Sequence, residues 1–178
     1  MILFLDFDGV LHPDHVYTSK RGLELRAPGD LLMHAPILES ILDDHDPQGY
    51  IKIVLSTSWV RVLGFDRTKG YLSNSLANRV IGATWHSGMA RDVDGYPNKH
   101  LDPFNWMTRF QQIEWYLKRH PTQKWLAIDD LHSSSEGWRT QLLGHLIWTD
   151  PDKGLGCPEK QDELRERIKS PTISEATP

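Results

Sequence analysis

The stretch ILFLDFDG, residues 2–9, joins a short apolar run to two acidic residues and a glycine. An apolar run without polar alternation is typical of a strand that is buried on both faces of a parallel sheet, which predicts a strand over residues 2–7. Alternation along a strand points Asp6 and Asp8 to the same side, and Gly9 lets the backbone turn sharply. The stretch therefore predicts a buried strand that ends in two neighbouring carboxylates.

Four more runs rich in aliphatic or β-branched residues follow, at residues 51–56, 79–85, 125–128 and 145–149. Helical patterns lie between and after them, at residues 36–44, from Thr108 onward, and from Pro158 to about Ile168. Thr108 with Gln111 forms a capping-box signature, which predicts a helix start there. Strands alternating with helices predict a doubly wound α/β fold, with a mostly parallel five-stranded sheet and helices on both faces.

The chain has 178 residues, about the size of one domain. We expect a single domain over residues 1–169 with small insertions at 12–34 and 87–103, neither long enough for a large cap domain. The second insertion is the turn-rich part of a longer irregular segment, residues 59–107. The polar residues 170–178 predict a disordered tail.

Bulk properties exclude several classes of protein. The formal net charge is −4 and no long basic run is present, so nothing predicts strong sequence-independent attraction to nucleic acid. A single cysteine, Cys157, permits no intrachain disulfide and suits a reducing compartment. The apolar N-terminal run is too short for a signal peptide or a membrane span. We expect a cytoplasmic protein without a membrane partner, and the oligomeric state stays open.

Acidic residues follow two of the predicted strands. Asp6 and Asp8 end the first strand, and Asp129 with Asp130 follows the fourth. Crowded carboxylates repel one another unless a cation joins them, and hard oxygen ligands favour Mg²⁺. Asp6 can then act as a nucleophile while Asp8 serves as acid and base. The alternative for each pair is a polar turn in which an aspartate caps the following segment.

Hydroxyl groups end the second predicted strand, where Ser56, Thr57 and Ser58 precede a helix start. Their side chains and the first backbone N–H groups of a helix can bind a phosphate oxygen, and Thr57 is the leading candidate, with Ser56 next. Helix capping by one of these hydroxyls is the alternative and is compatible with phosphate binding.

A phosphoryl site also needs a fixed positive charge. Arg109 is the leading candidate because it follows the Thr108 cap at a predicted helix start, and Lys99 and Lys118 compete with it. Arg61 can contact a substrate, although a surface salt bridge is the ordinary role of such a residue. His12 lies close enough to the acidic turn to touch a substrate, but no cluster of His and Cys completes a zinc site.

These motifs, in this order, resemble the haloacid dehalogenase (HAD) superfamily. The closer similarity is to the HAD domain related to Swiss Army Knife RNA repair proteins, through GVLHP (9–13), STSW (56–59), WLAIDD (125–130) and TDP (149–151) with GL (154–155). The resemblance covers most of the chain as scattered motifs. The sequence departs from the superfamily pattern at Arg109, where a lysine is usual. Arginine keeps the positive charge, but its guanidinium is broader than the ammonium of lysine.

The resemblance implies an aspartyl-phosphate on Asp6 and acid/base catalysis by Asp8, whose backbone carbonyl also binds Mg²⁺. It further implies a Thr57 contact to phosphate and metal binding by Asp129 and Asp130, with Asp130 the more direct ligand. Acids at both Asp6 and Asp8 look like the phosphatase branch of the superfamily.

The residues and the resemblance together predict a Mg²⁺-dependent phosphomonoesterase. An open site without a large cap suits a bulky substrate, such as a phosphorylated nucleic-acid end or a protein side chain, and a mononucleotide is nearly as good a candidate. A noncatalytic HAD-fold binding module is the alternative from another functional class.

Overall fold

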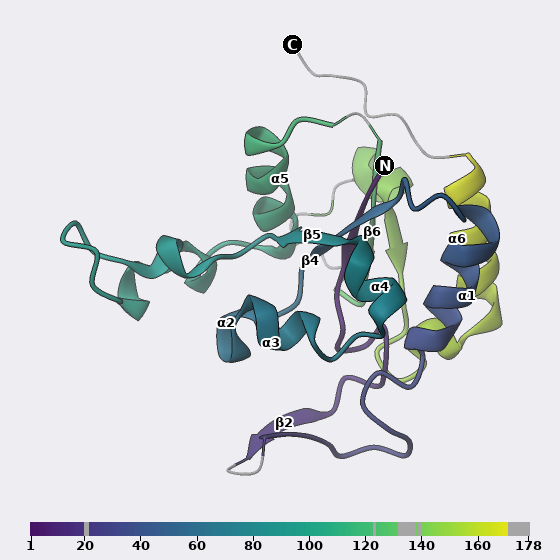
Figure 1. Ribbon diagram of the computed structural model, residues 1–178, viewed down its shortest axis with the longest axis horizontal. Coiled ribbons are helices and arrows are strands. Elements are labelled where there is room, and N and C mark those ends of the chain that lie inside the picture. Colours follow the sequence, from purple (N-terminus) through teal and green to yellow (C-terminus); the bar gives the residue numbers. More distant parts are fainter. Residues whose placement is uncertain (20–21, 123, 132–137, 139, 171–178) are drawn as a thin grey trace.

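In the computed structural model, which describes residues 1–19, 22–122, 124–131, 138 and 140–170, five parallel strands form one sheet in the order β5-β4-β1-β6-β7 (Figure 1). The strands are β1 (Ile2–Leu5), β4 (Lys52–Leu55), β5 (Val80–Ala83), β6 (Trp125–Asp129) and β7 (Leu146–Trp148). Each falls within one residue of a predicted run or inside it. β1 lies at the centre, paired with β4 on one side and β6 on the other.

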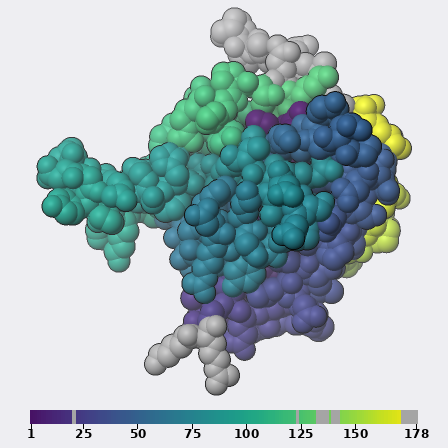
Figure 2. Space-filling model, viewed as in Figure 1, coloured from purple at the N-terminus to yellow at the C-terminus, as the bar shows by residue number. Residues whose placement is uncertain are grey.

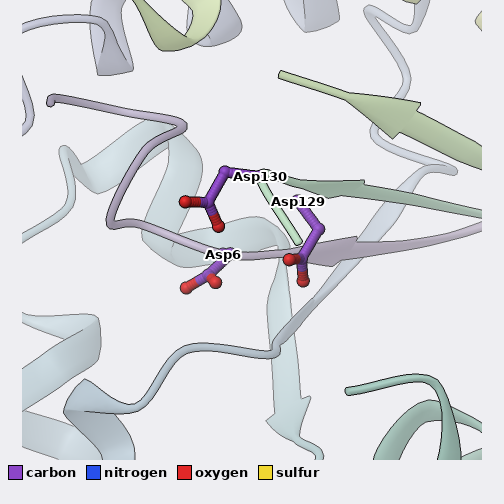
Figure 3. Close-up of side chains that lie close together, drawn as sticks. All are labelled: Asp6, Asp129 and Asp130. Atoms are coloured by element: carbon purple, nitrogen blue, oxygen red, sulfur yellow. The ribbon is translucent and has the colours of Figure 1, made fainter. Parts of the chain in front are cut away.

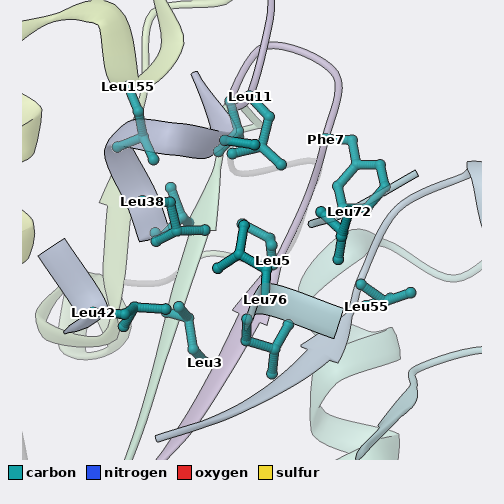
Figure 4. Close-up of a cluster of buried hydrophobic side chains, with 14 of the residues drawn as sticks. Leu3, Leu5, Phe7, Leu11, Leu38, Leu42, Leu55, Leu72, Leu76 and Leu155 are labelled. Carbon is teal, nitrogen blue, oxygen red and sulfur yellow. The ribbon is translucent and has the colours of Figure 1, made fainter. Parts of the chain in front are cut away.

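One face of the sheet packs against α1 (Ala35–His45), α4 (Asn74–Arg79) and α6 (Pro158–Lys169). Figure 4 shows Leu3 and Leu5 of β1 within this core, beside Leu38 of α1 and Leu76 of α4, all of them fully buried. Full burial of an aliphatic side chain contributes roughly 1.5–3 kcal/mol, so this layer is a major source of stability.

The opposite face packs against α5 (Arg109–Arg119). Phe4 of β1 meets Tyr116 of α5 edge to face, with ring centroids 5.5 Å apart, and Ile113 packs in the same cluster. Successive residues of β1 therefore enter opposite apolar layers. This explains why the sequence shows no polar alternation there, and it confirms the predicted doubly wound α/β architecture.

The predicted helices are confirmed with small changes at their ends. The pattern over 36–44 becomes α1, the pattern after Pro158 becomes α6, and α5 begins directly after Thr108. Both bonds of the capping box form: the Gln111 N–H donates to Thr108 Oγ1 at 3.3 Å, and the Thr108 N–H donates to Gln111 Oε1 at 2.9 Å.

The two irregular segments contain structure that the sequence did not resolve. Within residues 12–34 lies a hairpin of β2 (Val16–Ser19) and β3 (Gly22–Leu25). Within residues 59–107, α2 (Trp59–Leu63), α3 (Phe65–Lys69) and α4 precede β5. Helices of five or six residues are too short to produce a recognisable period, so only the first of these helix starts was expected.

Residues 84–107, which we call the arm, connect β5 to α5 through η1 (Ser87–Ala90), η2 (Lys99–Leu101) and η3 (Pro103–Asn105). The arm projects away from the sheet in Figures 1 and 2. Over the described residues no large cap domain covers the carboxyl ends of the strands, as expected.

The division into one domain over residues 1–169 stays a prediction. The expected disordered tail falls, from residue 171 onward, outside the described residues. In the described part of the chain, no helix has the length and apolar character needed to cross a membrane.

Candidate functional site

Asp6 lies directly after β1, and only 2% of its surface is exposed. Arg109 Nη2 donates to Asp6 Oδ2 at 2.6 Å, and the Phe7 N–H donates to Oδ1 at 2.7 Å. The side chain of Thr57 adds a further hydrogen bond to this carboxylate. Asp6 is therefore a buried acid with three donors around it, as a carboxylate in a low-dielectric setting requires.

Asp6, Asp129 and Asp130 form an acidic cluster, in which one oxygen of each residue lies within 4.8 Å of the others (Figure 3). The sheet explains their meeting, because β1 and β6 are parallel neighbours with Leu5 in register with Ile128. Asp6 directly follows β1, Asp129 is the last residue of β6 and Asp130 follows it, so all three lie at the carboxyl ends of the strands, at one edge of the sheet. The sequence predicted this edge as the ligand-binding region.

Burial raises the pKa of all three acids. It raises the pKa of Asp6 to about 6, although the charge of Arg109 opposes the rise. It raises the pKa of Asp130 to about 7, and the charge of Asp6 adds to this rise. Burial also raises the pKa of Asp129 well above its usual range, again against the effect of Arg109. One arginine thus offsets part of the repulsion among three acids.

A divalent cation fits this cluster. Carboxylate oxygens are the hard ligands that Mg²⁺ prefers, and three of them converge here from two strands. Acids that are buried and mutually repelled gain from a nearby cation, which reverses the rise in their pKa values. The side chain of Asp8 is not a member of the cluster.

The loop after β1 brings its backbone against Asp130. Gly9 has a φ of +65°, and a Cβ atom at this position would lie 2.5 Å from Asp130 Oδ2. The hydroxyl of Thr149 donates to the Gly9 carbonyl at 2.8 Å, and Trp148 Nε1 donates to the Asp130 carbonyl at 2.9 Å. Gly9 is therefore needed both for its backbone conformation and for the space beside the acidic cluster.

Arg109 is the cation that the fold brings to the acids. As the first residue of α5 it reaches Asp6, places Nε 3.0 Å from Asp129 Oδ2, and donates to the carbonyl of Ser56. Lys118 points elsewhere, being 68% exposed and paired with Glu114 at 3.5 Å. Lys99 lies on the arm. Of the three residues considered as the fixed positive charge, Arg109 is the one that contacts the acidic cluster.

The three hydroxyl residues differ in their surroundings. Thr57 is buried beside Asp6, and its Oγ1 accepts the Trp59 N–H at 3.3 Å. Ser58 is exposed, and its Oγ donates to Asp8 Oδ2 at 3.5 Å. Ser56 is buried, and its Oγ has no hydrogen-bond partner within the described part of the chain. Ser58 occupies the N-cap position of α2 and makes no side-chain capping bond, but the Thr57 bond satisfies the N–H of the first residue of α2. The alternative of helix capping therefore holds for Thr57, and it is compatible with phosphate binding.

Asp8 turns toward α2. Trp59 Nε1 donates to both Asp8 oxygens, at 2.9 and 3.0 Å, in addition to the Ser58 contact. His12 is fully buried with Nε2 3.4 Å from Asp8 Oδ1, which is long for a hydrogen bond. We expected His12 to touch a substrate, but its ring is enclosed by the protein and has no exposed surface. Sequence reasoning missed Trp59 as a partner of Asp8, and its only local signal was its place after the hydroxyl cluster.

A small pocket opens beside these groups. It has a volume of about 120 Å³ and is lined by Thr57, Ser58, Arg61, Phe104, Arg109, Gln112 and Leu131. Its polar lining includes a buried hydroxyl and two guanidinium groups, which are donors suited to an anion. Because Thr57 and Arg109 also contact Asp6, a phosphoryl group in this pocket would lie next to the proposed nucleophile.

Comparison with known proteins gives one result. The family model described as the HAD domain in Swiss Army Knife RNA repair proteins matches residues 2–159. No curated protein and no solved structure matches the chain.

Proposed function

The chain belongs to the HAD superfamily, through the family of HAD domains in Swiss Army Knife RNA repair proteins, and on this premise we propose that it is a Mg²⁺-dependent phosphomonoesterase with Asp6 as its nucleophile. Family membership indicates a phosphohydrolase-type function. The single observation that carries the finer proposal is the position of Asp6, which is bonded to Arg109 and Thr57 and adjoins two further acids.

Asp6 is suited to nucleophilic attack because Arg109 favours its charged form. An oxygen of Asp6 attacks the phosphorus in line, and the bond from phosphorus to the leaving oxygen breaks as the new bond forms. Arg109 and Thr57 donate to the phosphoryl oxygens, whose charge is redistributed in the transition state. The product of this first step is an aspartyl-phosphate on Asp6.

Asp8 is the proposed acid and base. In the first step it gives a proton to the leaving oxygen, and in the second it takes a proton from the water that attacks the aspartyl-phosphate. Inorganic phosphate then leaves, and Asp6 is regenerated. The hydrogen bonds from Trp59 and Ser58 support this role because they orient the Asp8 carboxyl group apart from the acidic cluster.

The proposed metal ligands are the carboxylates of Asp6, Asp130 and Asp129 and the backbone carbonyl of Asp8. Asp130 is the more direct ligand of the acidic pair, because Asp129 is already engaged by Arg109 and by the Leu131 N–H at 3.0 Å. When bound, Mg²⁺ would neutralise charge on the carboxylates and on the phosphoryl oxygens.

The substrate class belongs to the same proposal. The family is named for RNA repair, and no large cap covers the strand ends within the described part of the chain, so a phosphorylated nucleic-acid end or a nucleotide is the proposed substrate. Both present a terminal phosphate that the small pocket can receive.

Hydrolysis of an aryl phosphate in the presence of Mg²⁺ tests the proposal. We expect turnover by the wild-type protein, loss of turnover in Asp6→Asn, and little change in Asp152→Asn, which alters an exposed acid outside the cluster. An inactive wild type across a panel of phosphate esters, combined with Mg²⁺ binding, would favour the noncatalytic alternative. Undiminished turnover by Asp6→Asn would exclude Asp6 as the nucleophile.

A further inference from the structure

A second and larger hollow adjoins the small pocket. It has a volume of about 600 Å³, within the roughly 300–1,000 Å³ typical of ligand sites, and runs between α2 and the arm. The two hollows share Ser58 and Arg61 in their linings, so they lie side by side. We call the larger hollow the arm groove. Figure 2 shows how far the arm extends from the body of the molecule.

The arm groove has a rigid junction with the small pocket. Asp102, which is 4% exposed, accepts hydrogen bonds from Arg61 Nε at 3.0 Å and from Trp85 Nε1 at 3.1 Å. It also accepts the Phe104 N–H at 3.0 Å. A buried carboxylate with several donors fixes those donors in space. Arg61 and Trp85 are therefore held in place where the groove meets the proposed phosphate site.

The charge of the arm groove opposes that of the whole chain. Its lining includes three cations, Arg61, Arg91 and Lys99, and a single acid, Asp102, whereas the chain carries a net charge of −4. Arg91 donates to the Gly95 carbonyl within the arm, which orders it, and Lys99 is exposed. Local positive charge on an acidic protein favours an anionic occupant at this place.

We propose that the arm groove binds the strand of a single-stranded nucleic acid whose terminal phosphate lies beside Asp6. The inference rests on the proposed function and narrows its substrate from nucleotides in general to oligonucleotides. Phosphates along the strand meet Arg61, Arg91 and Lys99, and a base stacks on Trp85. This combination of a cationic groove with an aromatic side chain is how proteins bind single strands without sequence preference.

The single phosphate group of a mononucleotide would occupy the small pocket and leave Arg91 and Lys99 without an anion. A phosphopeptide would supply one phosphate for the small pocket but no regular series of charges along the groove. The repeated charge of a strand matches the three cations better than either, so the geometry favours a strand.

A binding measurement tests the groove without requiring turnover. The probes are labelled single-stranded tetranucleotides of RNA and of DNA, phosphorylated at the 3′ or the 5′ end. Fluorescence anisotropy measures their affinity for the Asp6→Asn protein over a range of salt concentrations. The substitutions Arg91→Gln and Lys99→Gln, added together, remove two phosphate contacts. The slope of log affinity against log salt concentration should become shallower by about 1.4. The gain in affinity on going from 1 M to 0.1 M salt should therefore be roughly 25-fold smaller than in the protein without these two substitutions. Lys169→Gln, on α6 across the sheet, is the matched control and should leave the slope unchanged.

A kinetic series tests the same groove in active protein. In the wild type, kcat/KM should be higher for a tetranucleotide than for a mononucleotide. In the double variant Arg91→Gln/Lys99→Gln this difference should be smaller, when each kcat/KM is expressed relative to that for an aryl phosphate. Equal affinity and equal salt slope in the double variant and its control would overturn the proposal, as would a phosphopeptide that binds as tightly and with the same dependence on Arg91 and Lys99. Failure of the proposed function gives a different result, namely no turnover of any substrate.

Discussion

Asp8 differs from the other acids of the site because a tryptophan holds it. Trp59 Nε1 bonds both Asp8 oxygens, while the same ring packs edge to face on Phe7 at a centroid distance of 5.3 Å. Trp59 is therefore a positioning residue for the proposed acid and base rather than a group that reacts.

Replacing Trp59 by phenylalanine keeps an aromatic ring in the core but removes the N–H donor. We expect kcat for an alkyl phosphate, whose leaving oxygen needs a proton, to fall about tenfold, equivalent to the ~1.4 kcal/mol of one hydrogen bond. The loss should be smaller for a dinitrophenyl phosphate, which leaves without protonation. Trp115→Phe on α5 is the control. Equal losses on both substrates would contradict a positioning role.

The raised pKa values of the acidic cluster, that of Asp130 among them, make the stability of the metal-free protein depend on pH. Burial raises the folded-state pKa values of Asp6 and Asp130 to about 6 and about 7, well above the ordinary value of an aspartate. The folded state thus holds protons that the unfolded chain has released, and stability falls as pH rises from about 4 to about 7.

Asp130→Asn removes part of this dependence. Without metal, the free energy of unfolding of the variant should fall less than that of the wild type between pH 5 and pH 8. Mg²⁺ should stabilise the wild type at pH 8, when the acids are ionised, and should stabilise the variant less. Urea unfolding with EDTA or with Mg²⁺ measures both effects. An identical response to Mg²⁺ in the two proteins would show that Asp130 is not a ligand.

Among the elements, α5 has the most direct influence on the site, because its first residue is Arg109. The capping box of Thr108 and Gln111 fixes where the helix begins and hence where the guanidinium lies. An N-cap bond at another helix provides a comparison: Ser73 caps α4 by accepting the Leu76 N–H at 3.3 Å.

Thr108→Ala and Ser73→Ala should each destabilise the protein by about 1 kcal/mol, the usual cost of losing such a cap. Only Thr108→Ala should also lower kcat, since only it disturbs the start of the helix that carries Arg109. Urea denaturation and turnover measured on the same preparations separate the two effects. A drop in kcat of the same size in both variants would point to general loss of folded protein.

At the scale of the whole molecule, a buried ion pair joins parts of the chain that are far apart in sequence. Arg79, at the end of α4, lies 2.6 Å from Asp46 and 3.1 Å from Asp43, and it also bonds the Asp46 carbonyl at 3.0 Å. Asp46 in turn accepts the Ile51 N–H at 2.7 Å, just before β4. The pair thus links the end of α1 to the start of β4 and to α4.

Arg79→Met should cost about 3–5 kcal/mol, because it leaves a buried carboxylate without its cation. Arg165→Met, which removes an exposed pair with Asp162 on α6, should cost no more than about 1 kcal/mol. Chemical denaturation of both variants gives the comparison. Similar losses in the two would mean that burial of the Arg79 pair has little energetic consequence.

The sequence by itself determined the elements that local patterns describe. Unbroken apolar runs predicted the buried strands, the capping box predicted where α5 begins, and the acids at residues 6, 129 and 130 were placed at strand ends. These features depend on neighbours within a few residues, so a single sequence records them.

Only the tertiary structure decided which of these features meet. The strand order placed Asp6 beside the Asp129 and Asp130 pair, and it selected Arg109 over Lys99 and Lys118 as the cation there. It also brought Trp59 to Asp8, and the arm to α2 as a groove. Contacts between residues so far apart in the chain depend on how layers pack, and such packing leaves no period or cap in the local sequence.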